Sequence, residues 1–266
     1  MVEKDVMSEV FQDFEALSVS ESDVAIRKPE HKPIHILKTM LKEHGRPAFI
    51  AGPMVRYSKL PFRELLRHYR TDIVYTPMIL AREFVRNKVA RLTDFTTNEK
   101  DRPVIVQVGA NNVEDLMKFV EMIHPYCDGI GLNCGCPIRD QVREGIGAAL
   151  MSEPDLVAEM VRSVKEKYGD KICIETKIRI HPDIEETKNF VRKVESAGVD
   201  FITVHGRTKN TRSSQPANFE AIKIIKETVS VPVVANGDCF SLDGALKIAE
   251  YTGVDGVMAV RGVLSN

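Results

Sequence analysis

The chain has 266 residues, of which 43% are hydrophobic, and a formal net charge of −1. This length and apolar content suffice for one large core, and no apolar run approaches the roughly 18 residues that a membrane-spanning helix needs. The near-zero charge excludes a uniformly basic nucleic-acid-binding protein, so any contact with RNA must come from local basic patches.

Residues 1–46 are predicted to form an N-terminal extension. Residues 1–33 mix acidic residues with serine and proline and lack a sustained apolar period, which predicts a mobile, partly disordered segment. Their acidity is unlike a secretory signal or a transit peptide, so we expect a cytoplasmic location, with the nucleus as a second compartment. Apolar residues near helical spacing in Ile34 to Lys42 predict a short helix that plugs or flanks the bottom of the main domain.

Short β-branched runs alternate with longer amphipathic segments from residue 47 to residue 266, as in repeated βα units with a parallel sheet. Eight repeats of this size predict an α/β fold of the TIM (β/α)8 barrel type, and no GxGxxG follows the first run to favour a doubly wound sheet. The eight predicted strands are Ala48 to Ala51, Asp72 to Thr76, Val104 to Val108, Gly129 to Leu132, Ile172 to Ile178, Phe201 to His205, Val233 to Ala235 and Gly256 to Val260.

The helices between these strands have recognisable ends. Gly198 and Gly253 lie where a helix should stop before the next strand. The sequence ends at Asn266, shortly after the eighth strand, so we expect a barrel truncated before its eighth helix. Residues suited to N-cap positions are Ser58, Asn112, Ser152, Asp183, Asn218 and Ser241.

Functional groups of such barrels gather where strands end and the following loops begin. At the last two strand ends, Asn236-Gly237-Asp238 and Arg261-Gly262 combine backbone N–H groups with a cation. This pattern favours a phosphate-bearing cofactor, because glycine permits close approach of the backbone to an anion. The alternative is that these glycines only make tight turns.

Lys177 lies on an apolar strand, where burial of an ammonium group is costly unless it meets an anion. A reduced flavin is such an anion, and Gln107 could bond the flavin pyrimidine edge. Alternatively, Lys177 is a barrel-interior partner of Glu175 or Asp238. His205 has two interpretations as well: a core histidine with satisfied hydrogen bonds, or a residue of the active site.

A series of short motifs at these strand ends resembles the ordered motifs of tRNA-dihydrouridine synthases, from about Ala48 to Leu264. Each motif alone is weak, but eight in family order are a strong signal. They are Gly52 to Val55 with Pro61-Phe62-Arg63, Asp72 to Met78 (DIVYTPM), Gln107-Val108-Gly109, Leu132 to Pro137 (LNCGCP), Gly147 to Met151 (GAALM), Thr176 to Arg179 (TKIR), Val204 to Thr208 (VHGRT) and Asn236-Gly237-Asp238.

The resemblance implies an FMN-binding barrel that NADPH, or NADH, reduces. It places the catalytic cysteine at Cys136 and leaves Cys134 at a variable position. It implies that Asn133, Arg179 and Arg207 bind the substrate. The residues implied to bind the cofactor are Pro53, Met54, Val55, Gln107, Lys177, His205, Asn236, Gly237, Asp238, Val260 and Arg261.

A Cys-x-Cys metal site is the other interpretation of Cys134 and Cys136. No further cysteine or histidine pair has zinc spacing, so we expect no metal. The five cysteines are an odd number in a large chain, which indicates free thiols in a reducing compartment.

The resemblance therefore implies an oxidoreductase. The C5=C6 bond of uracil is conjugated with the C4 carbonyl, so hydride from the flavin N5 should attack C6 and an acid must protonate C5. A thiol with a pKa near ~8.5 is mostly protonated at neutral pH, which suits Cys136 to that role. Reaching the bond requires flipping the base into a deep pocket.

tRNA is the expected partner, and the protein is expected to be a monomer that does not associate with membranes. The DIVYTPM, LNCGCP and ILAREF strings are most similar to the eukaryotic subfamily that acts at positions 20a and 20b of the D-loop. Basic residues at the rim could contact the tRNA, although a solvated helix face explains the first group as well. They are Arg82, Arg86, Lys88 and Arg91, and Arg207, Lys209 and Arg212.

The resemblance implies a helical tRNA-binding domain after the barrel, and because the sequence ends at Asn266 we expect this chain to lack it. Two other interpretations therefore stay open. One is another FMN-barrel oxidoreductase, similar to dihydroorotate dehydrogenase. The other is a truncated isoform with little or no activity.

Overall fold

The computed structural model describes residues 31–265. Most of the segment predicted to be mobile, residues 1–30, lies outside the described residues. No helix of the described part is long and apolar enough to cross a membrane.

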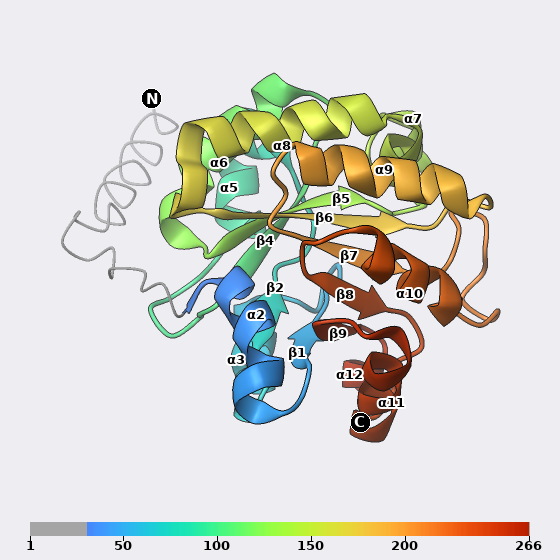
Figure 1. Cartoon of the computed structure of the whole chain (residues 1–266). Helices are drawn as coiled ribbons and strands as arrows, with labels where there is room; N and C mark the ends of the chain where they lie inside the picture. The colour runs from blue at the N-terminus through green and yellow to red at the C-terminus, as the bar shows by residue number, and fades with distance from the viewer. Residues whose placement is uncertain (1–30, 266) are drawn as a thin grey trace, which may run out of the picture.

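The described chain forms a closed barrel of eight parallel strands with helices around it, which confirms the predicted TIM barrel (Figure 1). The sheet order is β2-β1-β9-β8-β7-β6-β5-β4, and pairing of β2 with β4 closes it. The barrel strands are β1 (Ala48–Ala51), β2 (Ile73–Tyr75), β4 (Val104–Gly109), β5 (Gly129–Cys134), β6 (Cys173–Arg179), β7 (Phe201–His205), β8 (Val233–Asn236) and β9 (Gly256–Ala259).

A ninth, two-residue strand was not predicted. β3 (Ile79–Leu80) pairs with the end of β4, where Ile79 lies opposite Val108. It follows β2 after Pro77, which has no N–H to donate to the ladder and so interrupts the strand. The predicted strand over Asp72 to Thr76 therefore continues as a second short piece.

The helices lie outside the barrel, and α8 and α9 run side by side along it (Figure 1). Their apolar faces pack on the outward side chains of the strands in one large core cluster. The helices are α3 (Leu60–His68), α4 (Ala81–Arg86), α5 (Lys88–Asp94), α6 (Val113–Ile123), α7 (Arg139–Arg143), α8 (Pro154–Tyr168), α9 (Ile184–Ser196), α10 (Phe219–Thr228), α11 (Leu242–Thr252) and α12 (Gly262–Ser265), with 3₁₀ turns η2 (His124–Tyr126), η3 (Gly147–Ser152) and η4 (Gly169–Lys171).

The N-cap predictions hold at four of six positions. The predictions of Ser58 and Ser152 are wrong. The N-cap residue of α3 is Lys59 and that of α8 is Glu153, and neither helix has a side-chain cap. Ser58 instead accepts a hydrogen bond from the backbone N–H of Met54 at 2.9 Å, and so fixes the loop after β1. Confirmed caps, each accepting from a backbone N–H of the first turn, are Asn112, Asp183, Asn218 and Ser241.

Both predicted C-terminal glycines have a positive φ. Gly253 is the C-cap of α11 with a φ of 70°. Gly198 follows the C-cap residue of α9 and has a φ of 93°. Residues with a Cβ rarely adopt these angles, so glycine lets each helix end sharply before the next strand.

The predicted N-terminal helix is α2 (Pro33–His44), and it packs at the bottom of the barrel, where Leu37 approaches Gly256 at the start of β9. Leu37 is 1% exposed and belongs to an inner core cluster with Ile50, Ile73 and Phe201. Leu41, another apolar residue of this helix, is 56% exposed, because Pro33, Leu37 and Met40 form the buried face.

Within residues 31–265, only the four-residue α12 follows β9. An apolar groove of about 500 Å³ lies between α3 and α11, lined by side chains such as Phe62, Leu65 and Leu242.

Candidate active site

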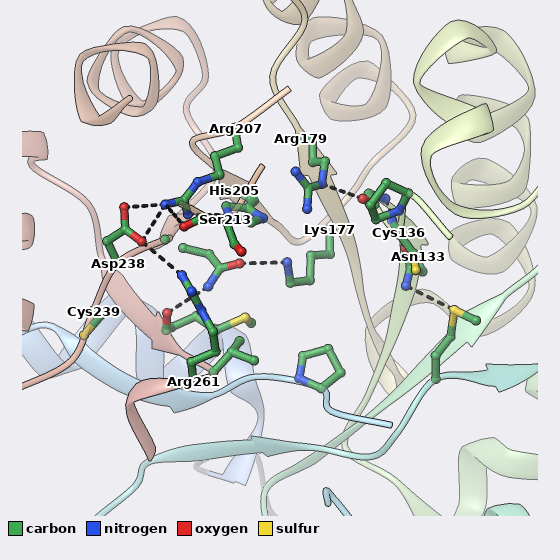
Figure 2. A pocket seen from close by; sticks show the side chains of 18 of the residues that line it. Asn133, Cys136, Lys177, Arg179, His205, Arg207, Ser213, Asp238, Cys239 and Arg261 are labelled. Atoms are coloured by element: carbon green, nitrogen blue, oxygen red, sulfur yellow. Dashed lines mark hydrogen bonds and ion pairs between the residues drawn. The ribbon is translucent and has the colours of Figure 1, made fainter. Parts of the chain in front are cut away.

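A cavity of about 310 Å³ opens at the carboxyl ends of the strands, where a TIM barrel carries its functional groups (Figure 2). Of the predicted site residues, all except Met54 line this cavity. Met54 is 7% exposed and its side chain belongs to the buried core. The lining residues predicted from sequence are Pro53, Val55, Gln107, Asn133, Cys136, Lys177, Arg179, His205, Arg207, Asn236, Gly237, Asp238, Val260 and Arg261.

Further lining residues were not identified from the sequence. Met78 lies within the DIVYTPM string, whose pattern could have identified it. Gln141 lies in the short helix α7, and Thr211 and Ser213 come from a loop without a strand-end signal. Cys239 and Phe240 follow the Asn-Gly-Asp turn.

The backbone around Cys136 is held from three directions. The Asn133 side-chain oxygen accepts from the N–H groups of Gly135 and Cys136, each at 3.0 Å. Arg179 donates from Nε to the Gly135 carbonyl at 2.7 Å. From η3, the Ala148 N–H donates to the Cys136 carbonyl at 2.8 Å. The cysteine is therefore fixed at the cavity wall rather than carried on a free loop.

Gly147 makes the contact between η3 and Cys136 possible. Its φ is 65°, and a Cβ added there would lie 2.6 Å from the Cys136 carbonyl oxygen and 3.1 Å from the Cys136 Cβ. A side chain would displace the cysteine, which explains the glycine of the GAALM string.

Cys134 and Cys136 face different surroundings. Cys134 is fully buried in the outer core cluster, and burial raises the pKa of its thiol. Cys136 is partly exposed and lines the cavity. The two sulfurs therefore do not form a chelating pair. No group of three or more His, Cys, Asp or Glu side chains placed to hold a metal occurs among residues 31–265.

Lys177 hydrogen-bonds neither Glu175 nor Asp238, although the charge of Glu175 acts on it. Its Nζ donates to the Asn236 side-chain oxygen at 3.0 Å, and Asn236 in turn donates to the Met258 carbonyl at 3.0 Å. Burial lowers the pKa of Lys177 to about 8, against the opposing effect of Glu175. One polar contact leaves this ammonium able to bind a ligand in the cavity.

Gln107 supplies an unused donor. Its side-chain oxygen accepts from Asn133 Nδ2 at 3.1 Å. Its Nε2 is buried and has no hydrogen-bond partner among the described residues. A buried donor without a partner costs free energy, so a ligand acceptor at this point would be stabilising.

His205 is held in one neutral tautomer. Arg207 lies 3.2 Å from its Nε2, and because a guanidinium can only donate, Nε2 accepts and Nδ1 carries the proton. Burial, followed by the positive charges of Lys177, Arg179, Arg207 and Arg261, lowers the pKa of His205 to about 2. The imidazole is therefore uncharged throughout the physiological range.

Asp238 anchors the basic side of the cavity. Arg207, which is 3% exposed, contacts both carboxylate oxygens at 2.6 Å, and Arg261 reaches one of them at 3.2 Å (Figure 2). Burial alone would raise the pKa of Asp238. The two arginines and the Ala217 N–H outweigh this effect, so the pKa of Asp238 is lowered. The Arg261 side chain keeps 49% of its surface exposed.

The two glycines after β8 and β9 are required by close packing. A Cβ on Gly237, whose φ is 129°, would lie 2.7 Å from the Ala217 Cβ, and one on Gly262 would collide with the Cys239 carbonyl. This supports the tight-turn interpretation. Both glycines also line the cavity beside Arg261, so their backbones border the space where a phosphate is expected.

The cavity as a whole is positively charged. Lys177, Arg179, Arg207 and Arg261 face it with one carboxylate, Asp238, and four positive charges minus one leave +3 with His205 neutral. A ligand with phosphate oxygens and an electron-accepting ring fits this charge and the free donor of Gln107.

Comparisons with known proteins agree with this geometry. A family model described as dihydrouridine synthase (Dus) matches residues 49–266. The chain is 62% identical over 258 residues to a tRNA-dihydrouridine(20a/20b) synthase of Saccharomyces cerevisiae, covering 94% of this chain and 70% of that protein. It is 52% identical over 234 residues to the Schizosaccharomyces pombe protein of the same name, covering 88% and 71%.

Among solved structures, the Amycolatopsis orientalis BexX/CysO complex superposes with a TM-score of 0.53 at 17% identity, over 83% of this chain and 82% of that chain. At this identity the likeness concerns the fold alone.

Proposed function

The chain belongs to the dihydrouridine synthase family, and from this premise we propose that it reduces uridines 20a and 20b of the tRNA D-loop with FMN and NADPH. The general activity, tRNA-dihydrouridine synthase, follows from the family and from the names of these relatives. The single observation that carries the site assignment is that Cys136, Lys177 and the unpaired donor of Gln107 line one positively charged cavity at the barrel mouth.

The residues present fit a flavin mononucleotide. Lys177 and Gln107 offer donors for the ring edge, and Arg261 with the backbones of Gly237 and Gly262 offers a site for the phosphate. Once reduced, the flavin would supply the hydride that uracil accepts at C6.

Cys136 would hold the proton that C5 needs. Its sulfur lies within electrostatic range of Lys177 and Arg179, so the thiolate left after proton transfer would be stabilised by two cations. His205 cannot share this role as an imidazolium, because it is neutral. We propose that it orients the ligand through its Nδ1–H.

The predicted substrate-binding residues have different roles in this proposal. Arg179 uses Nε and one terminal nitrogen on the carbonyls of Gly135 and Thr208, which leaves its other terminal nitrogen for the uracil. Asn133 uses both ends of its amide, so it acts by fixing the Cys136 loop. Arg207 acts through His205 and Asp238.

The tRNA would lie over the rim of the cavity with its uridine flipped inward. Arg82, Arg86, Lys209 and Arg212 are exposed and could contact phosphates. Arg91 of α5 turns inward and donates to the carbonyls of Phe84 and Val85 at the end of α4. It therefore connects the two helices and is not part of an RNA-binding surface.

The test is reduction of an unmodified tRNA transcript by the purified chain with FMN and NADPH, followed by mass spectrometry of the nucleosides. The proposal predicts a yellow protein and dihydrouridine in the product. Oxidation of dihydroorotate with no reaction on tRNA would support the dihydroorotate dehydrogenase-like alternative, and a colourless protein without turnover would support the inactive isoform.

We also propose that the protein is a monomer and that it is located in the cytoplasm.

A further inference from the structure

Glu175 is a buried acid that the proposed chemistry does not use. It lies on β6 two residues before Lys177, and since alternate residues of a strand point to the same face, both side chains enter the barrel interior. Glu175 has no exposed surface. It lies one layer beneath the cavity that Lys177 lines.

The opposite strand makes room for this carboxyl group. Gly131 of β5 is the register partner of Glu175, and a Cβ added to Gly131 would lie 2.5 Å from Glu175 Oε2. The same Cβ would lie 3.2 Å from the ring of Tyr75. A hydrophobic side chain at position 131 would fill this layer of an ordinary barrel, so the glycine and the acid form a matched pair.

Hydrogen bonding compensates the burial of Glu175 only in part. Neither carboxylate oxygen has a partner in hydrogen-bond geometry among the described residues, and the hydroxyls of Tyr75 and Thr203 also lack one. Both hydroxyls lie near enough to favour the ionised acid. Burying a carboxylate costs several kcal/mol, so a further compensating charge is expected.

Lys177 supplies that charge. Burial raises the pKa of Glu175 to about 7, and the Thr203 hydroxyl and then the charge of Lys177 oppose this rise. Burial lowers the pKa of Lys177 to about 8, and Glu175 opposes this fall. The two groups therefore titrate as a pair, each favouring the charged form of the other.

The other charged and titratable groups around the pair come from several strands. Around Glu175 they are Tyr75 of β2, Cys134 of β5 and Cys173 of β6. Those facing Lys177 are Cys136 after β5, Arg179 of β6, His205 and Arg207 at the end of β7, Asp238 after β8 and Arg261 after β9. Arg179 opposes protonation of Lys177, and Glu175 is the acid beneath it.

We propose that Glu175 is a positioning residue that keeps Lys177 charged inside the barrel, and thereby sets the pH range over which the site stabilises a reduced, anionic flavin. This inference rests on the proposed function, because it takes FMN as the ligand. Glu175 itself touches neither flavin nor uracil.

The test is the midpoint potential of the bound FMN against pH, measured by reduction with a reference dye and without tRNA. In the unchanged protein, the slope of this curve should change at the pH where Lys177 loses its proton, and this change of slope is the break that the variants are compared by. In Glu175→Gln the break should move to lower pH by about one unit or more, the coupling expected between interacting neighbours. A midpoint potential that changes by the same amount at every pH would not support the proposal, since removing any nearby charge would produce such a change.

Two further variants keep the result decisive. Lys177→Arg holds a permanent charge, so both Lys177→Arg and the Glu175→Gln/Lys177→Arg double variant should lack the break. Glu175→Met removes the buried carboxyl group at similar volume and should fold even if Glu175→Gln does not, with the same shift of the break.

Two outcomes would overturn the inference: a break at the same pH in Glu175→Gln and Glu175→Met, or a break that persists with Lys177→Arg. Both leave the proposed function standing, because the protein still binds FMN. Failure of the unchanged protein to bind FMN would instead defeat the proposed function.

Discussion

At the residue scale, Cys136 and Cys134 form a natural comparison. If Cys136 is the acid that protonates C5, as proposed, removing its thiol should slow re-oxidation of the reduced protein by tRNA about 10²–10⁴-fold, the range for loss of a general acid. Cys136→Ala is therefore expected to keep FMN binding and lose this rate, as measured by stopped-flow flavin absorbance. Cys134→Ala, changed in the outer core, should keep the rate. Equal rates for all three proteins would exclude Cys136 as the acid.

His205 should make the flavin-free protein sensitive to acid. Its pKa is about 2 in the folded chain against about 6.5 unfolded, so the unfolded state binds more protons below pH 6.5 and stability falls as pH falls from there toward 2. Between pH 7 and pH 5 this amounts to at most about 2 kcal/mol.

Urea unfolding at the two pH values measures this effect. His205→Asn should lose less stability on acidification than the unchanged protein, by up to that amount. An identical loss in both proteins would mean that His205 takes up a proton in the folded state.

The site residues that could be predicted from the sequence are those whose chemistry allows few alternative roles. A cysteine in a GCP string, or a lysine on an apolar strand, has few interpretations. Their partners could not be predicted, because partners depend on register: Lys177 meets Asn236 only because β6, β7 and β8 align at that level. Met54 is the one predicted site residue that does not line the cavity, because its side chain is buried.

At the element scale, η3 determines where Cys136 lies. Gly147→Ala should displace Cys136, because the new Cβ would lie 2.6 Å from its carbonyl oxygen. A shift of about 1 Å can cost about 10² in rate. Gly145→Ala is the matched control: its φ is 76°, but the nearest atom would lie 3.7 Å away.

Both substitutions carry a similar backbone strain of about 1–2 kcal/mol. Melting temperatures should therefore fall in both variants, while the tRNA-dependent rate should fall mainly in Gly147→Ala. Equal rates in the two variants would show that η3 does not position the cysteine.

Helix α2 should stabilise the barrel from below. Leu37→Ala removes a side chain that is 1% exposed and should cost about 2–5 kcal/mol in the free energy of unfolding. Leu41→Ala, on the same helix but 56% exposed, should change it by no more than about 0.5 kcal/mol. Chemical denaturation distinguishes the two, and a small cost for Leu37→Ala would mean that α2 only rests on the barrel.

Helices and strands could be predicted where the βα sequence pattern repeats along the chain. Features that depend on a few neighbouring residues could not. All eight barrel strands followed from β-branched runs. The short β3 did not, because Pro77 divides the run. Ser58 and Ser152 resemble N-caps in sequence, but Lys59 and Glu153 occupy those positions, and Ser58 bonds the loop after β1 instead.

At the scale of the whole molecule, charge is distributed unevenly. The chain carries a net charge of −1, yet its main cavity carries +3. Composition could not reveal this, because the barrel collects four cations from the ends of three strands, β6, β7 and β9, at one point. A flavin phosphate, an anionic reduced ring and a tRNA backbone would all be attracted to the same face.

The most direct measurement of the proposed activity is a map of dihydrouridine in tRNA from Saccharomyces cerevisiae cells that lack their own 20a/20b enzyme. Expression of this chain should restore dihydrouridine at both positions, and expression of the Cys136→Ala variant at a matched level should restore neither. Unreduced uridine at 20a and 20b in cells that contain the folded, flavin-bound chain would contradict the account.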